Sequence, residues 1–409
     1  MNLEIVTIGT ELLLGFTVDT NGAEIGRQLS AVGIRVVRRT SIADRPDEIR
    51  DAVGAALHRT GAVITTGGLG PTRDDITKSI IAGLYGWPID FDETLWDALV
   101  ARYRRLGRVP AESNRSQAEV PRGAVVLPNR WGSAPGLWLE GDPGLVIMLP
   151  GVPLELRNLM THEVTPRLAA RAGGGVIRSR TVRATGIPES TLAERLGEIE
   201  TAIEPLTLAY LPGLEGVDLR VTAWSLPPAE AERRLADAVG ELRARAGDVV
   251  YGEDGDDLAA LVLERARAAG VRLAVAESCT GGLLGGRITE VPGSSDVFAG
   301  GIIAYENAAK TNLLGVPAAL IDREGAVSEP VAAAMAQGAL DRLGADLAVS
   351  ITGVAGPGGG TDAKPVGTVC FGLAGRGGTA TRRSILIGTR SDIRYRAAQA
   401  ALFLLFQRL

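Results

Sequence analysis

Histidine and cysteine are scarce in this 409-residue chain, and their scarcity limits the chemistry available to it. The only histidines are His58 and His162, so nothing beyond residue 162 can supply an imidazole base from the same chain. The only cysteines, Cys279 and Cys370, are too few for a disulfide framework or a cysteine-based structural zinc site. A bound metal would therefore use oxygen ligands, and a catalytic base in the second half must be another residue type.

The chain also lacks an excess of positive charge and long apolar runs. There are 43 basic and 48 acidic residues, and the net charge of −5 argues against a nucleic-acid partner. No apolar run approaches the length that crosses a bilayer, and Met1 is followed by an amphipathic strand rather than by an apolar signal core. We therefore expect a cytoplasmic protein without a membrane partner.

Length and hydrophobic periodicity together predict three domains, because 409 residues exceed what one core usually organises. Strand and helix patterns alternate in the first and last parts of the chain, whereas the part between them shows strand, helix, two strands and helix. A glycine run at 172–175 and a turn-rich stretch at 251–256 mark the boundaries. The predicted fold class is α/β: two open α/β domains with mainly parallel sheets, 1–172 and 254–409, joined by a small α+β domain, 173–253.

Three glycine-bearing loops of the first domain follow predicted strands near 3–8, 62–66 and 144–148. In open α/β sheets ligands collect at the carboxyl ends of the strands, so the three loops predict one crevice. Glycine lets backbone N–H groups approach an anion closely, and the start of a following helix adds a favourable dipole. We expect a phosphate site in this crevice, with a loop that includes Gly67, Gly68, Gly70 and Thr72.

Carboxylates are also expected at this crevice. A diphosphate beside carboxylates normally requires a hard divalent cation, so Mg²⁺ or a similar ion is the expected cofactor of this domain. Asp74 and Asp75 also precede a predicted helix that begins near residue 76, and we expect one of the two to be only its N-cap. The candidate metal ligands are Glu11, Asp44, Asp74 and Asp75.

The segments 9–15, 19–21, 65–75 and 149–153 resemble the CinA family (competence/damage-inducible protein). The resemblance implies a first domain with the molybdopterin-binding fold, relatives of which hydrolyse ADP-ribose to AMP and ribose 5-phosphate with a divalent metal. It also implies acidic roles for Asp44 and Asp75 and a phosphate loop containing Gly67, Gly68 and Thr72. Molybdopterin binding without pyrophosphatase activity is the alternative, since a fold alone does not establish a function.

The middle segment resembles the KH module of CinA-type proteins. A KH module that binds nucleic acid carries a Gly-x-x-Gly loop between two helices, with basic groups on the phosphates. The only such string here, 213–216, lies between two predicted strands and contains the acidic Glu215. We therefore interpret it as a hairpin turn, and the segment as a spacer or a dimerisation element of a homodimer.

In the last domain, a nearly all-apolar predicted strand at 271–276 runs into Ser278 just before a helix. A turn between strand and helix exposes a nucleophile and aims backbone N–H groups at a developing oxyanion. Because no histidine is available, the base must be lysine, tyrosine or a carboxylate. Of the two lysines, Lys310 and Lys364, the first follows the next predicted strand, so we expect a Ser278–Lys310 pair, with Tyr305 relaying a proton or positioning the lysine.

Two other interpretations of this turn stay open. Cys279 is the stronger nucleophile if it is deprotonated, although a cysteine in such a place is more often a small buried filler. Ser278 is alternatively only a helix N-cap. A glycine-rich loop at 352–360 and a second loop at 293–295 favour a ligand site near Ser278.

The domain resembles the nicotinamide-nucleotide amidase family that is fused to CinA proteins, in the blocks 277–282, 305–310, 352–360 and 364–368. The resemblance implies deamidation of nicotinamide mononucleotide without a cofactor, so this nucleotide and ADP-ribose are the expected partners. The alternative is a binding protein of DNA uptake or recombination with decayed active sites. The candidate substrate contacts are Thr280, Gly281, Gly282, Ser295, Thr352, Gly353 and, for the phosphate, Arg390.

Overall fold

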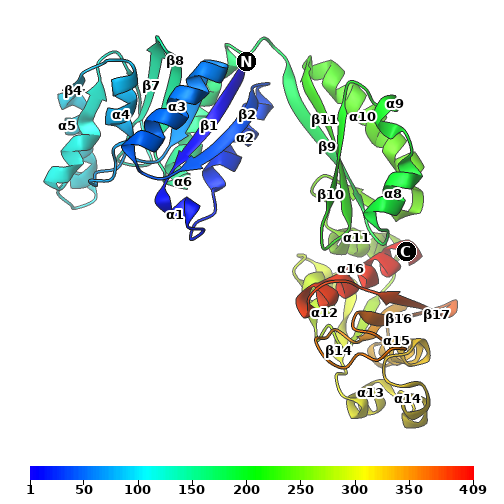
Figure 1. Cartoon of the computed structure of the whole chain (residues 1–409). Coiled ribbons are helices and arrows are strands. Elements are labelled where there is room, and N and C mark those ends of the chain that lie inside the picture. Colours follow the sequence, from blue (N-terminus) through cyan, green and yellow to red (C-terminus); the bar gives the residue numbers. More distant parts are fainter. The chain divides into compact units, whose positions relative to one another are not determined.

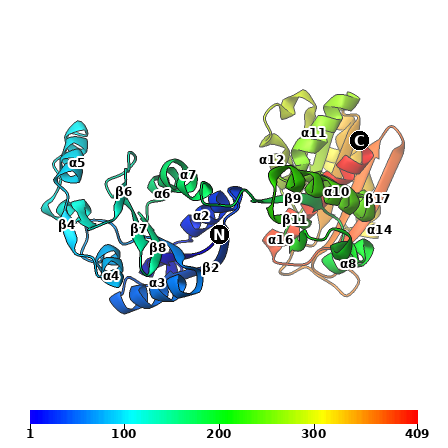
Figure 2. The same ribbon diagram turned by 90° about the horizontal axis from the view of Figure 1, so that it is seen from above.

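The computed structural model describes residues 1–409 and contains two compact units (Figure 1, Figure 2). One unit comprises Met1–Arg178 with Thr222–Arg234, and the other comprises Ser179–Val221 with Leu235–Leu409. The two domain boundaries drawn from the sequence stay a prediction. No helix combines the length and the apolar character that a bilayer crossing requires.

A six-stranded mixed sheet forms the centre of the first unit. Four neighbouring strands are parallel, which confirms the predicted open α/β arrangement, and two further strands at one edge are antiparallel. The antiparallel strand 136–141 was missing from the prediction, because its short apolar run between two glycines has no diagnostic period. The order is β2 (Arg35–Ile42), β1 (Asn2–Ile8), β3 (Ala62–Thr66), β8 (Gly144–Leu149), β7 (Gly136–Gly141) and β6 (Val125–Leu127).

Helices cover both faces of this sheet (Figure 2). Successive side chains of a strand point to opposite faces, so Leu3 and Ile5 of β1 belong to the core on one face of the sheet, whereas Val6 and Ile8 belong to the core on the other face. A small second sheet pairs β4 (Ile89–Phe91) with β5 (Glu119–Pro121). The helices are α1 (Thr10–Leu13), α2 (Thr20–Ala31), α3 (Pro46–Thr60), α4 (Thr77–Leu84), α5 (Glu93–Arg105), the 3₁₀ segment η1 (Glu112–Ala118), α6 (Pro153–Leu159), the π segment η2 (Met160–Val164) and α7 (Thr165–Ala169).

The middle segment has the predicted order of strand, helix, two strands and helix, and a short fourth strand follows. Its four-stranded sheet has the order β10-β11-β9-β12. Alternate residues of β11 are buried from Val217 to Ala223, as in a strand with one face toward the core. The elements are β9 (Val176–Ala184), α8 (Glu189–Leu196), α9 (Ile199–Ala202), β10 (Thr207–Pro212), β11 (Val217–Leu226), α10 (Pro228–Ala246), the 3₁₀ segment η3 (Gly247–Val249) and β12 (Val250–Glu253).

A five-stranded mixed sheet forms the centre of the last domain. The strand order is β14 (Phe298–Ile303), β13 (Leu273–Glu277), β15 (Leu347–Gly353), β16 (Thr368–Gly375) and β17 (Gly378–Ile385), with the first three parallel and the last two antiparallel. The helices of this domain are α11 (Leu258–Ala269), α12 (Leu283–Thr289), α13 (Asn307–Leu314), α14 (Ala318–Glu324), α15 (Glu329–Leu343) and α16 (Arg390–Arg408), with the 3₁₀ segment η4 (Ser294–Asp296) before β14. The side chain of Asp257 caps the helix α11.

The strand order places the end of β13 at a topological switch point. The chain passes from β13 to β14 on one side and later to β15 on the other side. In open α/β sheets a crevice forms at such a point, outside the carboxyl ends of the strands. Because β17 runs antiparallel to β16, it ends at the same edge, and α16 therefore starts beside this crevice.

Candidate active site

Ser278 and Lys310 meet at the switch point of the last domain. Ser278 directly follows β13, and Lys310 lies in α13, which follows β14. The Lys310 Nζ atom is 3.0 Å from the Ser278 Oγ atom, and only 1% of the lysine is exposed. Two residues that are 32 positions apart in the sequence thus form a buried side-chain pair.

The other partners of Lys310 make it suitable as a base. Its Nζ atom donates to the carbonyl oxygens of Ala304 and Tyr305, each at 3.0 Å. A neutral amine has two N–H groups, which the two carbonyls accept, and its lone pair is then directed at the only partner that can donate, the Ser278 hydroxyl. Burial lowers the pKa of Lys310 from its ordinary value, although the nearby Cys279 opposes this shift. Burial therefore makes the neutral amine, which can take up a proton, more favourable than it is in an exposed lysine.

The structure also distinguishes this pair from the alternatives. Burial raises the pKa of the Cys279 thiol to about 11, so the thiol is protonated at neutral pH and is a poor nucleophile. The strand β13 ends at Glu277, and the N-cap of the following helix α12 is Gly282. Ser278 therefore does not cap this helix. Lys364, the other lysine of the domain, donates to the carbonyl of Glu324 at 2.8 Å.

Two side chains that the sequence analysis did not select hold the turn after Ser278. The buried carboxylate of Glu277 accepts the backbone N–H groups of Gly282, Leu284 and Gly285 at 2.8–3.1 Å. From α16, Arg394 donates to the carbonyls of Cys279 and Thr280 at 3.1 and 2.7 Å. Both residues fix the backbone of the turn that follows Ser278, and neither has a motif that reveals this role in a single sequence.

A cavity of about 190 Å³ opens beside the pair. Arg390 on its wall donates to the Gly356 carbonyl at 2.6 Å and to the Tyr305 hydroxyl at 3.2 Å. The Tyr305 hydroxyl thus contacts the arginine, and only the Tyr305 backbone carbonyl contacts Lys310. The lining residues are Ser278, Cys279, Tyr305, Asn307, Lys310, Ala326, Val327, Thr352, Gly353, Ala355 and Arg390.

Of the other residues predicted to contact the substrate, only some line this cavity. Thr352 and Gly353 line the cavity, and the Thr352 hydroxyl donates to the Ala326 carbonyl at 2.8 Å. Thr280, Gly281 and Gly282 form the turn behind Ser278 and are not among the lining residues. Ser295 precedes β14, so it lies at the opposite end of the sheet from Ser278 and is exposed. The structure therefore does not bring Ser295 to this cavity.

In the first domain, the three predicted loops do lie together. The Gly67 N–H donates to the Leu149 carbonyl at 3.1 Å, and Asn21 donates to the Gly151 carbonyl at 2.7 Å. Gly67 and Gly68 have positive φ angles of 107° and 67°, and a Cβ atom on Gly67 would lie 2.1 Å from the Ile8 carbonyl oxygen. Glycine at this position is thus required by the close approach of the loop to β1.

The four candidate metal ligands of this domain do not form a ready-made cage. The chain has no group of three or more His, Cys, Asp or Glu side chains that could hold a metal ion. Asp44 accepts from the backbone and hydroxyl of Thr10 at 2.9 and 3.2 Å, and Asp75 accepts in the same way from Thr72. Glu11 and Asp74 are exposed. The carboxylates therefore do not form a complete metal site by themselves.

The expectation that Asp74 or Asp75 caps the following helix is wrong. The helix α4 begins at Thr77, its N-cap is Ile76, and no side chain caps it. Asp75 instead closes the loop by accepting the Thr72 N–H at 2.8 Å. Asp75, one position before the N-cap, has a nearer backbone donor in its own tight loop, which the sequence pattern does not reveal.

The Gly-x-x-Gly string of the middle segment is a tight turn between β10 and β11, as predicted. Its Gly213 N–H donates to the Gly216 carbonyl at 2.8 Å. Glu215 in this turn accepts from Arg183 at 2.6 Å and from the Tyr395 hydroxyl of α16 at 2.7 Å, and Arg287 of α12 lies 3.7 Å away. The turn is thus bound to the two helices that flank the Ser278 loop.

Comparison with known proteins gives consistent results along the whole chain. Residues 4–170 match a family model described as "Probable molybdopterin binding domain", 179–252 match "Damage-inducible protein CinA KH domain", and 255–409 match "CinA C-terminal domain". A CinA-like protein of Gemmatimonas aurantiaca is 53% identical over 98% of this chain and 95% of its own length. A CinA-like protein of Chlorobaculum tepidum is 42% identical over 100% and 99%. The crystal structure of a competence/damage inducible protein from Agrobacterium tumefaciens has 41% identity over 36% of this chain and 91% of its own, with a TM-score of 0.35.

Proposed function

This chain belongs to the CinA family, and from that premise we propose that its last domain deamidates nicotinamide mononucleotide to nicotinic acid mononucleotide and ammonia. The observation that carries the proposal is the contact of 3.0 Å between Lys310 Nζ and Ser278 Oγ, in which the two other partners of the amine are carbonyl oxygens. Such a pair activates a serine hydroxyl without histidine.

The reaction proceeds in two halves. Ser278 Oγ attacks the carboxamide carbon while Lys310 takes the hydroxyl proton, and Lys310 then gives this proton to the amide nitrogen as the C–N bond breaks and ammonia leaves. Water next attacks the resulting ester and transfers a proton to Lys310. This proton returns to Ser278 Oγ as the ester bond breaks, which releases the carboxylic acid and restores the pair. The reaction needs no cofactor.

The cavity suggests how the substrate is oriented. A volume of about 190 Å³ is small for a whole nucleotide, so we place the nicotinamide ring inside and the ribose phosphate over its mouth. Arg390 provides the positive charge for that phosphate. The Ser278 N–H donates to the Ile351 carbonyl at 2.9 Å and is not free for the oxyanion, so we assign an oxyanion contact to the side-chain amide of Asn307 on the cavity wall.

The test is ammonia release from nicotinamide mononucleotide by the full chain, Ser278→Ala and Cys279→Ala. We expect release by the unchanged protein and by Cys279→Ala, and none by Ser278→Ala. If the unchanged protein releases no ammonia, the deamidase proposal fails, and the binding-protein alternative of DNA uptake or recombination is favoured. Equal release by the unchanged protein and Ser278→Ala would reject only the nucleophile.

We further propose that the first domain hydrolyses ADP-ribose to AMP and ribose 5-phosphate. The supporting observation is the convergence of the loops after β1, β3 and β8, since glycine-bearing loops let backbone N–H groups approach a diphosphate closely. A requirement for divalent metal is a separate proposal, because the carboxylates form no cage of their own. Measuring ADP-ribose turnover with and without a chelator tests the metal requirement, and a rate that the chelator does not change would contradict it. Binding of a molybdopterin without turnover is the competing outcome.

A further inference from the structure

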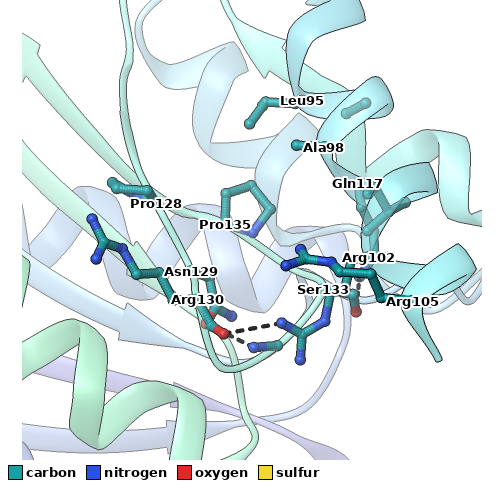
Figure 3. A pocket seen from close by; sticks show the side chains of 13 residues that line it. Leu95, Ala98, Arg102, Arg105, Gln117, Pro128, Asn129, Arg130, Ser133 and Pro135 are labelled. Carbon is teal, nitrogen blue, oxygen red and sulfur yellow. Dashed lines mark hydrogen bonds between the residues drawn. The ribbon is translucent and has the colours of Figure 1, made fainter.

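Besides the cavity at Ser278, the protein has a cavity in the first domain that neither proposed reaction explains. It has a volume of about 370 Å³, within the range of roughly 300–1,000 Å³ of small-molecule sites. One wall is α5, and the opposite wall is the loop 128–135 between β6 and β7 (Figure 3). This cavity is about twice as large as the one beside Ser278.

The α5 wall changes from apolar to basic along its length. Leu95, Ala98, Leu99, Arg102 and Arg105 all line the cavity, and their spacing of three or four residues puts them on one face of the helix. Apolar side chains occupy the first turns of this face and guanidinium groups occupy the last turn. Figure 3 shows Leu95 and Ala98 away from Arg102 and Arg105.

The opposite wall likewise has apolar and basic side chains. It contributes the apolar rings of Pro128 and Pro135 and a third guanidinium, that of Arg130. Arg102 donates to the Arg130 carbonyl at 3.0 Å, whereas the guanidinium groups of Arg105 and Arg130 have no hydrogen bond or ion pair. The cavity is thus lined by the unpaired guanidinium groups of Arg105 and Arg130 and by that of Arg102, which makes one hydrogen bond. None of its lining residues is a carboxylate.

The cavity adjoins the glycine-loop crevice. Asn129 of its wall donates to Glu155, which lies in α6 directly after the loop 149–153. On the other side, Lys78 donates to the Ser116 carbonyl in η1 and lies close enough to Asp75 to interact with its charge. Gln117 of η1 lines the cavity and donates to Ser133 at 3.1 Å. The cavity walls are therefore tied to two of the three glycine-bearing loops.

We propose that this cavity binds a nucleoside 5′-phosphate, with the base against Leu95, Leu99 and Pro135 and the phosphate on Arg102, Arg105 and Arg130. An apolar wall suits the faces of a base, and planar guanidinium groups bind phosphate oxygens in pairs. A bare phosphate would use only the basic end, and a nucleoside only the apolar end. The inference rests on the proposed hydrolysis of ADP-ribose in one respect only: AMP, a product of that reaction, is chosen as the nucleotide with which binding is tested.

Calorimetric titration of the full chain with AMP, adenosine and inorganic phosphate tests the proposal. We expect AMP to bind at least tenfold more tightly than either fragment. Arg105→Ala should weaken AMP binding at least fivefold, whereas Arg104→Ala, on the same helix but outside the cavity, should not change it. Equal effects of the two variants, or phosphate binding as tight as AMP binding, would overturn the assignment.

Two further variants separate this cavity from the crevice. Ala98→Trp should fill the cavity and abolish AMP binding, while Ala101→Trp, exposed on the same helix and outside the cavity, should not. Asp75→Ala should remove ADP-ribose turnover but keep the affinity for AMP. Loss of AMP binding in Asp75→Ala with normal binding in Ala98→Trp would assign AMP to the glycine loops and overturn the inference. Unchanged AMP binding without any ADP-ribose turnover would reject the hydrolysis alone.

Discussion

The two candidate sites occupy equivalent places in their sheets but differ in how complete they are. The crevice of the first domain follows β1, β3 and β8, and the Ser278 cavity follows β13, β14 and β15, in each case at a switch point of an open α/β sheet. In the last domain, the proposed nucleophile Ser278 and the proposed base Lys310 are buried and in contact. In the first domain, the carboxylates of Asp44 and Asp75 accept hydrogen bonds from their own loops, and no metal-binding group is formed.

This difference shows that a shared architecture determines where a ligand binds but not what the site can do alone. The last domain contains every proton donor and acceptor that its proposed reaction requires. The first domain provides backbone N–H groups and separate carboxylates, so its proposed reaction requires further groups from the ligand or the solvent.

Loss of the amine should have the largest effect. Lys310→Met keeps most of the apolar stem but removes the base, and we expect deamidation to fall by about a thousandfold or more, in the upper part of the range for general-base catalysis. Lys364→Met is the matched control and should keep the activity, because Lys364 only contacts a backbone carbonyl outside the cavity. If Lys310→Met retains a tenth of the rate, another group is the base and the contrast between the domains disappears.

Chelation should affect only the first domain. A divalent ion typically contributes several kcal/mol of charge stabilisation, so ADP-ribose turnover should fall by about a hundredfold or more with a chelator, and similarly in Asp75→Asn. Asp51→Asn, an exposed change on α3, should have no effect. Deamidation by the same sample serves as the internal reference. Equal loss of both activities on chelation would show that the two sites are not distinguished by their need for a metal.

The pH dependence of deamidation should follow Lys310. Since burial lowers the pKa of this lysine, the rate should fall about tenfold per pH unit below that pKa and level off above it. Between the lowered pKa and the ordinary value of 10.5, the unfolded chain binds one proton more than the folded chain. The contribution of Lys310 to stability therefore rises with pH in this window. A rate that stays constant as pH falls well below neutrality would contradict a lysine base.

The middle segment should have the smallest effect. Glu215→Ala removes the partner of Tyr395, and the adjacent Arg394 holds the Ser278 turn. We expect kcat to fall a few-fold, which corresponds to about 0.5–2 kcal/mol of coupling, with KM unchanged. Glu241→Ala breaks an ion pair with Arg245 within α10 and is the control. An unchanged kcat in Glu215→Ala would show that the hairpin turn is only a spacer.

Much of this molecule was predictable from local sequence, and the missing parts share a physical cause. The strands that end at Ser278 and at the glycine loops, and the contact of Ser278 with Lys310, followed from apolar runs, turn residues and the lack of histidine. Glu277 and Arg394 were missed because their roles depend on backbone groups of the folded turn. Ser295 was misplaced because a loop before a strand and a loop after it lie at opposite edges of the sheet.

The protonation state of Lys310 at its contact with Ser278 tests the account most directly. The chain contains only three lysines, Lys78, Lys310 and Lys364, so protein labelled with ¹⁵N at the lysine Nζ atoms should give three resonances, assigned by replacing each lysine with arginine. Burial lowers the pKa of Lys78 to about 8, so its assignment is essential. We predict that the Lys310 resonance titrates below 10.5, because burial disfavours the ammonium form. A Lys310 ammonium that stays protonated up to 10.5 would contradict the central claim.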